Sequence, residues 1–321
     1  MELSLRRLRM LRELHRRGTV TAAATALHYS PSGVSQQLAQ LEREVGVKLV
    51  ERHGRRVQLT ELGLLLSEHA EDILGSVERA TAALERAQEG VTARLDAGVW
   101  ASVASGLLPT ALSALAVDHP GIEVRTVELA PEETAEAVRD GALDLSFVID
   151  YSDHTMPWDA DLARVVIAVE RLHVAAPSGT VPEGTTSLTA LAESPWILPG
   201  PRSHFGRAVR IACQRHGFAP RVSHKVEEQS TALAMVAGGL GVTLVSDLGL
   251  TWLPAGVDIV ALDEPVMRTV SIAYRTTSPL RRSVELVIDA VRTAAAEKGV
   301  AASSPLPGPP GTDTSQDGRE A

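Results

Sequence analysis

The sequence predicts an α+β protein of several domains: a small helical domain, one long helix, and a larger α/β domain of two lobes. Apolar residues recur at helical spacing through the first domain, a near-heptad pattern follows, and beyond Leu95 short apolar runs alternate with helical segments. We divide the chain as follows: 1–59, the helical domain; 60–90, the long helix; 91–298, the α/β domain, with lobe I at about 91–162 and 265–298 and lobe II at about 163–264; and 299–321, a disordered tail.

The N-terminal domain contains three predicted helices and a hairpin. The first helix spans 3–17 and ends before a glycine, and an alanine-rich second helix spans 21–27. After the turn "HYSPSG", a third helix begins at Pro31 or Ser32, with Ser30 as its N-cap. The stretch "VKLVERHGRRVQLT" then predicts a short two-stranded hairpin with basic residues at its tip. Together these elements predict a winged helix-turn-helix.

A long helix without proline begins near Thr60. Its apolar seam has spacings of three and four, and consists of Leu62, Leu66, His69, Ile73, Val77, Ala80, Leu84 and Ala87. A helix of about 40 Å cannot bury this seam against so small a domain, so we expect it to pack against a second copy of itself. The alternative is that it lies on the C-terminal domain.

The C-terminal part alternates predicted strands and helices. The segments "LDAGVW", "LLPTALSALAVDH", "IEVRTVEL", "PEETAEAVRDG" and "LDLSFVI" follow a β-α-β-α-β order, which predicts a mostly parallel sheet. A second set of such segments follows, then a strand at 266–274 and a closing helix at 279–297. Two α/β lobes in sequence predict a cleft between them that binds a small ligand. The Pro/Gly/Ser-rich tail, 299–321, has no apolar face and is expected to be disordered.

The net charge of −9 is distributed unevenly. Residues 1–60 carry 11 Lys and Arg against 5 Asp and Glu, while the remainder carries 20 against 35. A basic domain on an acidic body favours a polyanionic partner, and the alternative is chance segregation of solvated charge. No apolar run approaches the ~20 residues that a membrane span needs. Cys213 is the single cysteine, which excludes an internal disulfide and favours a reducing, cytoplasmic location.

The third helix presents serine and glutamine where a solvated helix usually carries charged residues. Glutamine can bond adenine through two hydrogen bonds, and serine can bond bases or phosphates. In "ERHGRRVQL", Arg52, Arg55 and Arg56 could contact phosphates or enter a minor groove. A neutral solvated helix and an ordinary basic turn are the alternatives. In combination, the helix and the hairpin predict binding to the major groove of DNA.

These motifs resemble the LysR-type transcriptional regulators. The specific match is "TVTAAATALHYSPSGVSQQLAQLEREVGVKLVERHGRRVQLTELG", with looser matches in "LLPTALSALAVDHPGIEV", "VRDGALDLSF" and "MVAGGLGVTLVS". The resemblance covers about residues 2–297. It implies a winged helix-turn-helix, a dimerising linker helix and a periplasmic-binding-protein-like effector domain of two lobes. It also implies a tetramer of paired dimers, and regulation of promoters by a small metabolite.

Carried over by position, the resemblance places DNA contacts on Pro31, Ser32, Ser35 and Gln36, with a wing arginine at Arg52 or Arg55. Thr21 and Arg56 complete the set of expected contacts. The family often has a basic residue in place of Gln36, so a preference for adenine is expected there. The resemblance places effector contacts at Ser102, Val103 and Ser105, after the first strand. On the second lobe, the stretch "PGPRSHFGR" supplies Arg202, Ser203 and His204 before a helix, and Phe147 is a further expected contact.

The expected effector has an anionic group, for which Arg202 is the best candidate, although this arginine could also be a surface cap. The loop "LAPEET" has Ala130 and Pro131 where relatives often place a hydroxyl, which argues against a benzoate-like effector.

An enzyme and an assembly module are the two alternative classes of function. An enzyme would need a nucleophile, a metal set or a cofactor motif, and the sequence shows none: "AGGLG" follows a helix and precedes a strand, the reverse of a dinucleotide loop. The histidines have no ligand spacing, so neither a metal nor a cofactor is expected. A metabolite-binding protein whose head serves only for assembly would be expected to lack the basic wing, which this sequence has.

Overall fold

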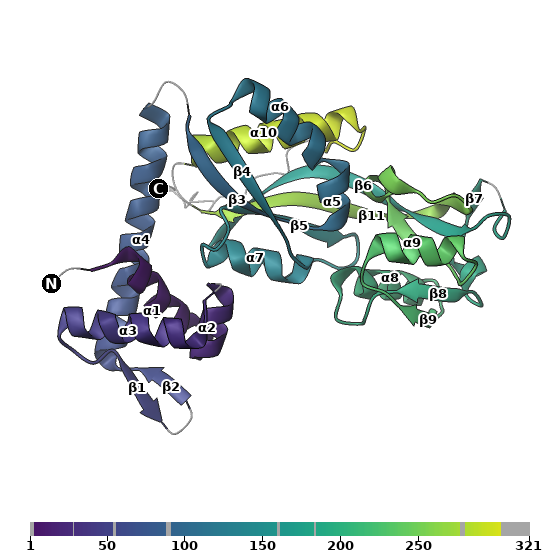
Figure 1. Ribbon diagram of the computed structural model, residues 1–321. Helices are drawn as coiled ribbons and strands as arrows, with labels where there is room; N and C mark the ends of the chain where they lie inside the picture. Colours follow the sequence, from purple (N-terminus) through teal and green to yellow (C-terminus); the bar gives the residue numbers. More distant parts are fainter. Residues whose placement is uncertain are drawn as a thin grey trace, which may run out of the picture.

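The computed structural model describes residues 3–27, 29–53, 56–87, 91–158, 161–182, 184–276 and 280–302. Over these residues the chain forms a helical head, a long helix and an α/β domain (Figure 1). The start of the predicted disordered tail is ordered: Val300 packs in the core of the α/β domain, and Ala301 forms a bridge with Ala168. Residues 303–321 of the tail and the wing residue Arg55 lie outside the described residues. No described helix has the length and apolar character needed to span a membrane.

The head confirms the predicted winged helix-turn-helix. Its elements are α1 (Leu5–Arg17), α2 (Val20–Ala26), α3 (Pro31–Val45), β1 (Val50–His53) and β2 (Arg56–Leu59). The hydroxyl of Ser30 accepts a hydrogen bond from the N–H of Gly33 at 3.1 Å, and this cap begins α3 where the sequence predicted. Apolar side chains of all three helices, together with Leu49 just before β1, form the core of the head: Met10, Leu11, Leu14, Ala24, Val34, Leu38, Leu41 and Leu49.

The long helix is α4 (Glu61–Ala87). One face is covered by the head and the α/β domain, and it buries Gly63, Ser67, Ala70, Leu74, Ala82 and Glu85. Much of the predicted seam lies uncovered: Leu62 is 48% exposed, Val77 40% and Leu84 66%. Leu66 instead packs partly against the core of the head, and the side chain of Ala87 lies outside the described part of the chain.

The α/β domain is built on a seven-stranded sheet with the order β10-β6-β11-β5-β3-β4, and β7 pairs with β11. Its strands are β3 (Ala93–Val99), β4 (Ile122–Glu128), β5 (Leu145–Tyr151), β6 (Leu162–Pro177), β7 (Thr185–Thr186), β10 (Thr243–Ser246) and β11 (Val257–Arg275). The predicted parallel pairing is confirmed for the segments on which it rested, since β3 runs parallel to both β4 and β5. The sheet as a whole is mixed rather than mostly parallel, because β11 runs antiparallel to both β5 and β6, and β10 antiparallel to β6.

The two long strands explain this difference. β6 and β11 pair along their lengths, from Val257 with Pro177 to Arg275 with Leu162, and so pass through both lobes. The sequence predicted only 266–274 of β11, because the polar stretch "LDEP" interrupts its apolar pattern. Apolar alternation shows that a segment is a strand, but not the direction in which it runs.

The remaining elements cover the sheet. α5 (Ala101–Gly106) follows β3, and Figure 1 shows α6 (Leu108–Asp118) and α10 (Arg282–Glu297) on one face, with α7 (Pro131–Arg139) on the other. Lobe II adds a parallel pair and two helices: β8 (Pro195–Leu198), α8 (His204–Arg215), β9 (Arg221–Lys225) and α9 (Gln229–Ala237). Two short 3₁₀ helices complete it: η1 (Leu188–Leu191) and η2 (Asp247–Trp252).

Candidate functional site

The N-terminal half of α3 presents a polar surface. Ser32, Ser35 and Gln36 are exposed at helical spacing, as are Pro31 at the start of the helix and Thr21 on α2. Gln37, which the sequence did not single out, instead accepts a hydrogen bond from the Nε of Arg7 at 3.1 Å. The hydroxyl of Ser32 shares a hydrogen bond with that of Ser30 at 3.1 Å. Exposed hydroxyl and amide groups of this kind can contact base edges or phosphates.

The hairpin beside α3 carries the other predicted contacts. Its antiparallel register pairs Arg52 with Val57 and His53 with Arg56 across a tight ribbon. Arg52 and Arg56 therefore occupy strand positions next to the tip, as expected for a wing.

Much of the positive charge of the head is already neutralised within the chain. Arg7 on α1 forms an ion pair with Glu44 on α3 at 2.5 Å. Arg12, Arg16 and Arg17, at the other end of α1, face acidic residues of α4 and α7. The excess positive charge of residues 1–60 is thus only partly available to a polyanion, a correction to the inference from charge distribution alone.

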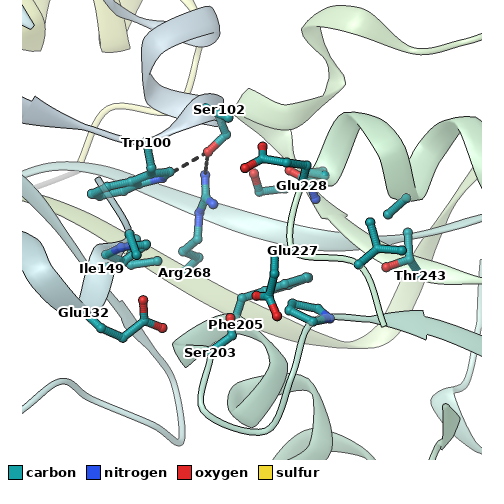
Figure 2. Close-up of a pocket in the computed structure, with 18 of the residues that line it drawn as sticks. Trp100, Ser102, Glu132, Ile149, Ser203, Phe205, Glu227, Glu228, Thr243 and Arg268 are labelled. Carbon is teal, nitrogen blue, oxygen red and sulfur yellow. Dashed lines mark hydrogen bonds between the residues drawn. The ribbon is translucent and has the colours of Figure 1, made fainter. Parts of the chain in front are cut away.

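A cavity of about 370 Å³ lies where the two lobes meet (Figure 2). Lobe I supplies the end of β3, the start of α5 and the loop from β4 into α7, while lobe II supplies the starts of α8 and α9. The strands β5, β6, β8, β10 and β11 form its floor. This volume suits a small metabolite.

The structure brings two of the seven predicted effector residues to this cavity, Ser102 and Ser203. Val103 and Phe147 are buried in the core of the domain, and the hydroxyl of Ser105 bonds the carbonyl of Ala101 at 2.9 Å. Arg202 is exposed in the turn before α8 and does not line the cavity.

Sequence reasoning missed the acidic side chains of the cavity. Glu128, Glu132 and Glu133 line it from lobe I, and Glu227 and Glu228 from lobe II. A signal was present: a Glu-Glu pair follows a strand at the start of a helix in both "LAPEET" and "KVEEQS". Figure 2 shows Glu132, Glu227 and Glu228 around the cavity that Arg268 also lines.

Arg268 is buried and paired within the floor of the cavity. Its Nε donates to Glu170 at 2.7 Å, and its terminal nitrogen donates to the hydroxyl of Ser102 at 3.2 Å. Glu170 is fully buried, and its second oxygen accepts the N–H of Leu248 at 2.7 Å. Since these residues are Cα partners on β6 and β11, the ion pair joins the two strands that connect the lobes.

His204 forms a buried aromatic cluster beside the cavity. Its ring lies 4.5 Å from that of His154 and 5.4 Å from that of Tyr151, centroid to centroid. Burial, together with repulsion from His154, lowers the pKa of His204 to about 4. Burial also lowers the pKa of His154 and raises that of Tyr151 to about 12. The histidine pair is therefore neutral near pH 7 and links α8 to the turn that follows β5.

Acidification is expected to destabilise the protein through His204. Because its folded pKa lies below the ordinary value, its contribution is present above about pH 6.5 and is lost as the pH falls towards 4, by at most about 3 kcal/mol. Urea unfolding across this pH range measures the effect. The loss should be smaller in His204→Phe and unchanged in His15→Gln, which replaces an exposed histidine. An unaltered pH profile in His204→Phe would contradict this assignment.

Comparison with known proteins matches both parts of the chain. Residues 5–64 match the bacterial regulatory helix-turn-helix protein, lysR family, and residues 88–296 match the LysR substrate binding domain. A probable cat1 operon transcriptional activator of Acinetobacter lwoffii is 32% identical over 249 residues, covering 76% of this chain and 80% of that protein. A probable hydrogen peroxide-inducible genes activator of Mycobacterium avium is 32% identical over 229 residues, covering 70% and 72%. A cysteine mutant of Corynebacterium glutamicum OxyR has the same fold, with a TM-score of 0.59, 24% identity and 93% of each chain covered.

Proposed function

The chain belongs to the LysR family of bacterial transcriptional regulators, and from this premise we propose how its head reads DNA and how the cleft between its lobes regulates DNA binding. As a member it is a DNA-binding regulator with a domain for a small-molecule effector. We assign DNA reading to residues 1–59, pairing of subunits to 60–90, and effector binding without catalysis to 91–298. The site of action is promoter DNA in the cytoplasm.

The single observation that carries the DNA-reading proposal is the exposed Ser32, Ser35 and Gln36 surface on a capped α3 beside a basic hairpin. Thr21, Pro31 and the wing arginines complete the proposed contact set. Selection of duplexes from a random pool by the full-length protein tests this function. We expect a site of two related half-sites, as paired heads require. Recovery of no preferred sequence would contradict the proposal.

The effector is proposed to bind in the 370 Å³ cavity between the lobes. Ser102 and Ser203 are retained as contacts from the predicted set, because both line the cavity. The expected anionic group depended on Arg202, which lies outside the cavity. Closure of the lobes on the effector changes how subunits pack and how the bound DNA is bent, provided the effector binds the two states with different affinity.

Peroxide sensing is the second candidate, because the M. avium relative is described as a hydrogen peroxide-inducible genes activator. Cys213 is the single cysteine and is fully buried on α8. Burial raises the pKa of its thiol to about 12, which disfavours the reactive thiolate. A disulfide within the chain would need a second cysteine. These facts favour a reversibly bound metabolite over oxidation.

Subunit pairing through α4 is proposed from its exposed apolar side chains, Leu62, Leu65, Val77 and Leu84. A dimer formed on this seam carries two heads, and pairing of two dimers gives the tetramer that the family resemblance implies. We expect Val77→Glu with Leu84→Glu to dissociate the dimer, because four charges per dimer would meet in an apolar seam. Analytical ultracentrifugation measures the change. Val117→Glu, at an exposed valine of α6, is the control. A dimer that survives the double substitution would contradict pairing through this face.

We propose that α7 links the cavity to the head. Its first turn lines the cavity with Pro131 and Glu132, while Asp140, at its other end, is fully buried against α1. The carbonyl of Asp140 accepts a hydrogen bond from Arg12 at 2.7 Å, and its carboxylate pairs with Arg17. Glu136 adds a second contact to Arg17 at 2.9 Å. A ligand that displaces α7 would thus act directly on α1.

Asp140→Asn is expected to loosen this connection, because the charge that faces Arg16 and Arg17 is removed. Amide hydrogen exchange in α1 should rise by about tenfold, the change that a loss of about 1.4 kcal/mol of local stability gives. Glu123→Gln, which removes one partner of an exposed ion pair with Arg94, should leave α1 unchanged. Exchange rates in α1 that match the wild type would exclude α7 as the link.

A further inference from the structure

We propose that the effector carries a positively charged ammonium or guanidinium group attached to a small apolar body. This inference rests on the proposed effector-binding role of the cavity and names the chemical class of its ligand. The cavity between the lobes identifies the site, and the charges on its wall determine which ligand it favours. The anionic effector expected from the sequence and the cationic effector proposed from the structure predict opposite charge preferences at the cavity.

The wall of the cavity is strongly acidic. Five glutamates line it, and Arg268 is the single basic residue among the lining side chains that the structure describes. That arginine is already neutralised by the buried carboxylate of Glu170, and a further donor nitrogen is taken by Ser102. All five glutamates are exposed residues, so their charge is open to ligand and solvent alike. An anionic ligand would therefore meet uncompensated negative charge, an effect that is strongest at low salt.

The N-termini of the helices that face the cavity do not make it favourable to anions. Helix N-termini ordinarily favour anions, and α7, α8 and α9 all begin here. Each, however, already has carboxylates of the protein beside it. Glu132 and Glu133 lie in the first turn of α7, Glu132 also accepts the backbone N–H of His204 at the start of α8, and Glu228 is the N-cap residue of α9.

Glutamates from both lobes of the cavity can bind a cation. Glu227 accepts the N–H of Gly200 at 3.0 Å through one oxygen, so its other oxygen is available as an acceptor. Glu132 belongs to lobe I and Glu227 to lobe II. One cationic group bound between their carboxylates would therefore stabilise the closed arrangement of the lobes. The attraction of a cation to both carboxylates thus provides the difference in affinity that a regulatory ligand needs.

The apolar side chains of the wall favour an apolar body for the part of the ligand that carries no charge. Trp100, Ile149, Ile197, Phe205 and Val226 contribute to the same wall. Trp100 and Phe205 offer aromatic surface to an apolar group, and an aromatic face also attracts cations. The volume of about 370 Å³ accommodates a small amine and excludes a folded peptide.

The charge of the cavity can be measured without knowing the effector. Ala130→Cys places a thiol on the cavity wall, and Ser113→Cys places one on exposed α6 as a control. The full-length proteins are treated at low salt with a trimethylammonium-ethyl and a sulfonatoethyl methanethiosulfonate, which differ in charge. Because both reagents attack the same thiolate, the ratio of their rates reports the local potential. Wild type, whose Cys213 is buried, is the blank.

We expect the ratio of the cationic to the anionic labelling rate to be roughly tenfold higher in Ala130→Cys than in Ser113→Cys, because several carboxylates lie within a Debye length of residue 130. Adding Glu133→Gln and Glu228→Gln should reduce this ratio towards the control value. Glu228 occupies the N-cap position of α9, but its side chain makes no cap hydrogen bond, and Glu133 lies in the first turn of α7. Equal ratios at the two positions, or faster anionic labelling in the cavity, would overturn the proposal.

A matched ligand pair tests the class directly. 2-Phenylethylamine and 3-phenylpropionate share an aromatic body and differ in the sign of their charge. We expect the amine to bind at least tenfold more tightly by calorimetry, and tighter binding of the carboxylate would overturn the inference. Duplex selection with the same preparation reports separately on DNA reading. Failure of selection alone would contradict the proposed function, and failure of the charge test alone would contradict the ligand class.

Discussion

Ser35→Glu combined with Gln36→Glu should lower the affinity of the protein for its selected duplex by about 100-fold or more. Both side chains are exposed on the N-terminal half of α3, the part of a recognition helix that enters the major groove. Each substitution removes a polar contact and places a carboxylate against the phosphate backbone, at about 1–3 kcal/mol per contact. Fluorescence anisotropy with a labelled duplex measures the change.

A matched control separates this local effect from net charge. Ser113→Glu combined with Gln214→Glu makes the same chemical changes at exposed positions of α6 and α8. We expect DNA affinity within about twofold of wild type, because charges farther than a Debye length from the duplex are screened. Thermal unfolding should show that both variants fold. Equal losses of affinity in the two double variants would remove the reason for assigning α3 to DNA reading.

Arg268→Met is expected to cost about 3–5 kcal/mol of folding free energy, the largest stability effect that we predict. The substitution leaves Glu170 fully buried, with the N–H of Leu248 as its remaining neutral donor. It also removes the hydrogen bond to Ser102 and the ion pair between the two strands that connect the lobes. Urea unfolding at pH 7 measures the loss.

Two further variants make this prediction specific. Adding Glu170→Gln to Arg268→Met should recover much of the stability, because the amide oxygen can still accept from Leu248 and no buried charge remains. Arg94→Met breaks the exposed pair with Glu123 and should cost less than about 1 kcal/mol. A single Arg268 variant no less stable than Arg94→Met would show that the buried pair does not stabilise the junction of the lobes.

The head could be predicted closely because its signals are local. Ser30, Pro31 and Gly33 lie within four positions and together begin α3, and the pattern of its apolar side chains fixes which face is buried. The partners of the head were not readable in this way. Arg12 and Arg17 belong to the positive charge counted for residues 1–60, yet they meet Asp140, which is more than 120 positions away in the sequence and is brought close by the fold.

The cavity could be located approximately but not described from the sequence. Its wall comes from the ends of strands that are far apart in the chain. Glu132 and Glu227 therefore line the same cavity only because the fold brings their segments together. Arg202 looked like the best cation, whereas Arg268 lay within an apolar strand and attracted no notice. Which arginine is buried beside the ligand depends on the antiparallel pairing of β6 and β11, which apolar periodicity does not show.

The most direct test of the account is a footprint of the full-length protein on its selected duplex, repeated at increasing salt. The account predicts separated protected patches on one face of the DNA, one for each head of a pair. Protection should fall steeply with salt, by about a thousandfold in affinity between 50 and 200 mM if six or more phosphates are contacted. Absence of protection at low salt would contradict the claim that this head reads DNA.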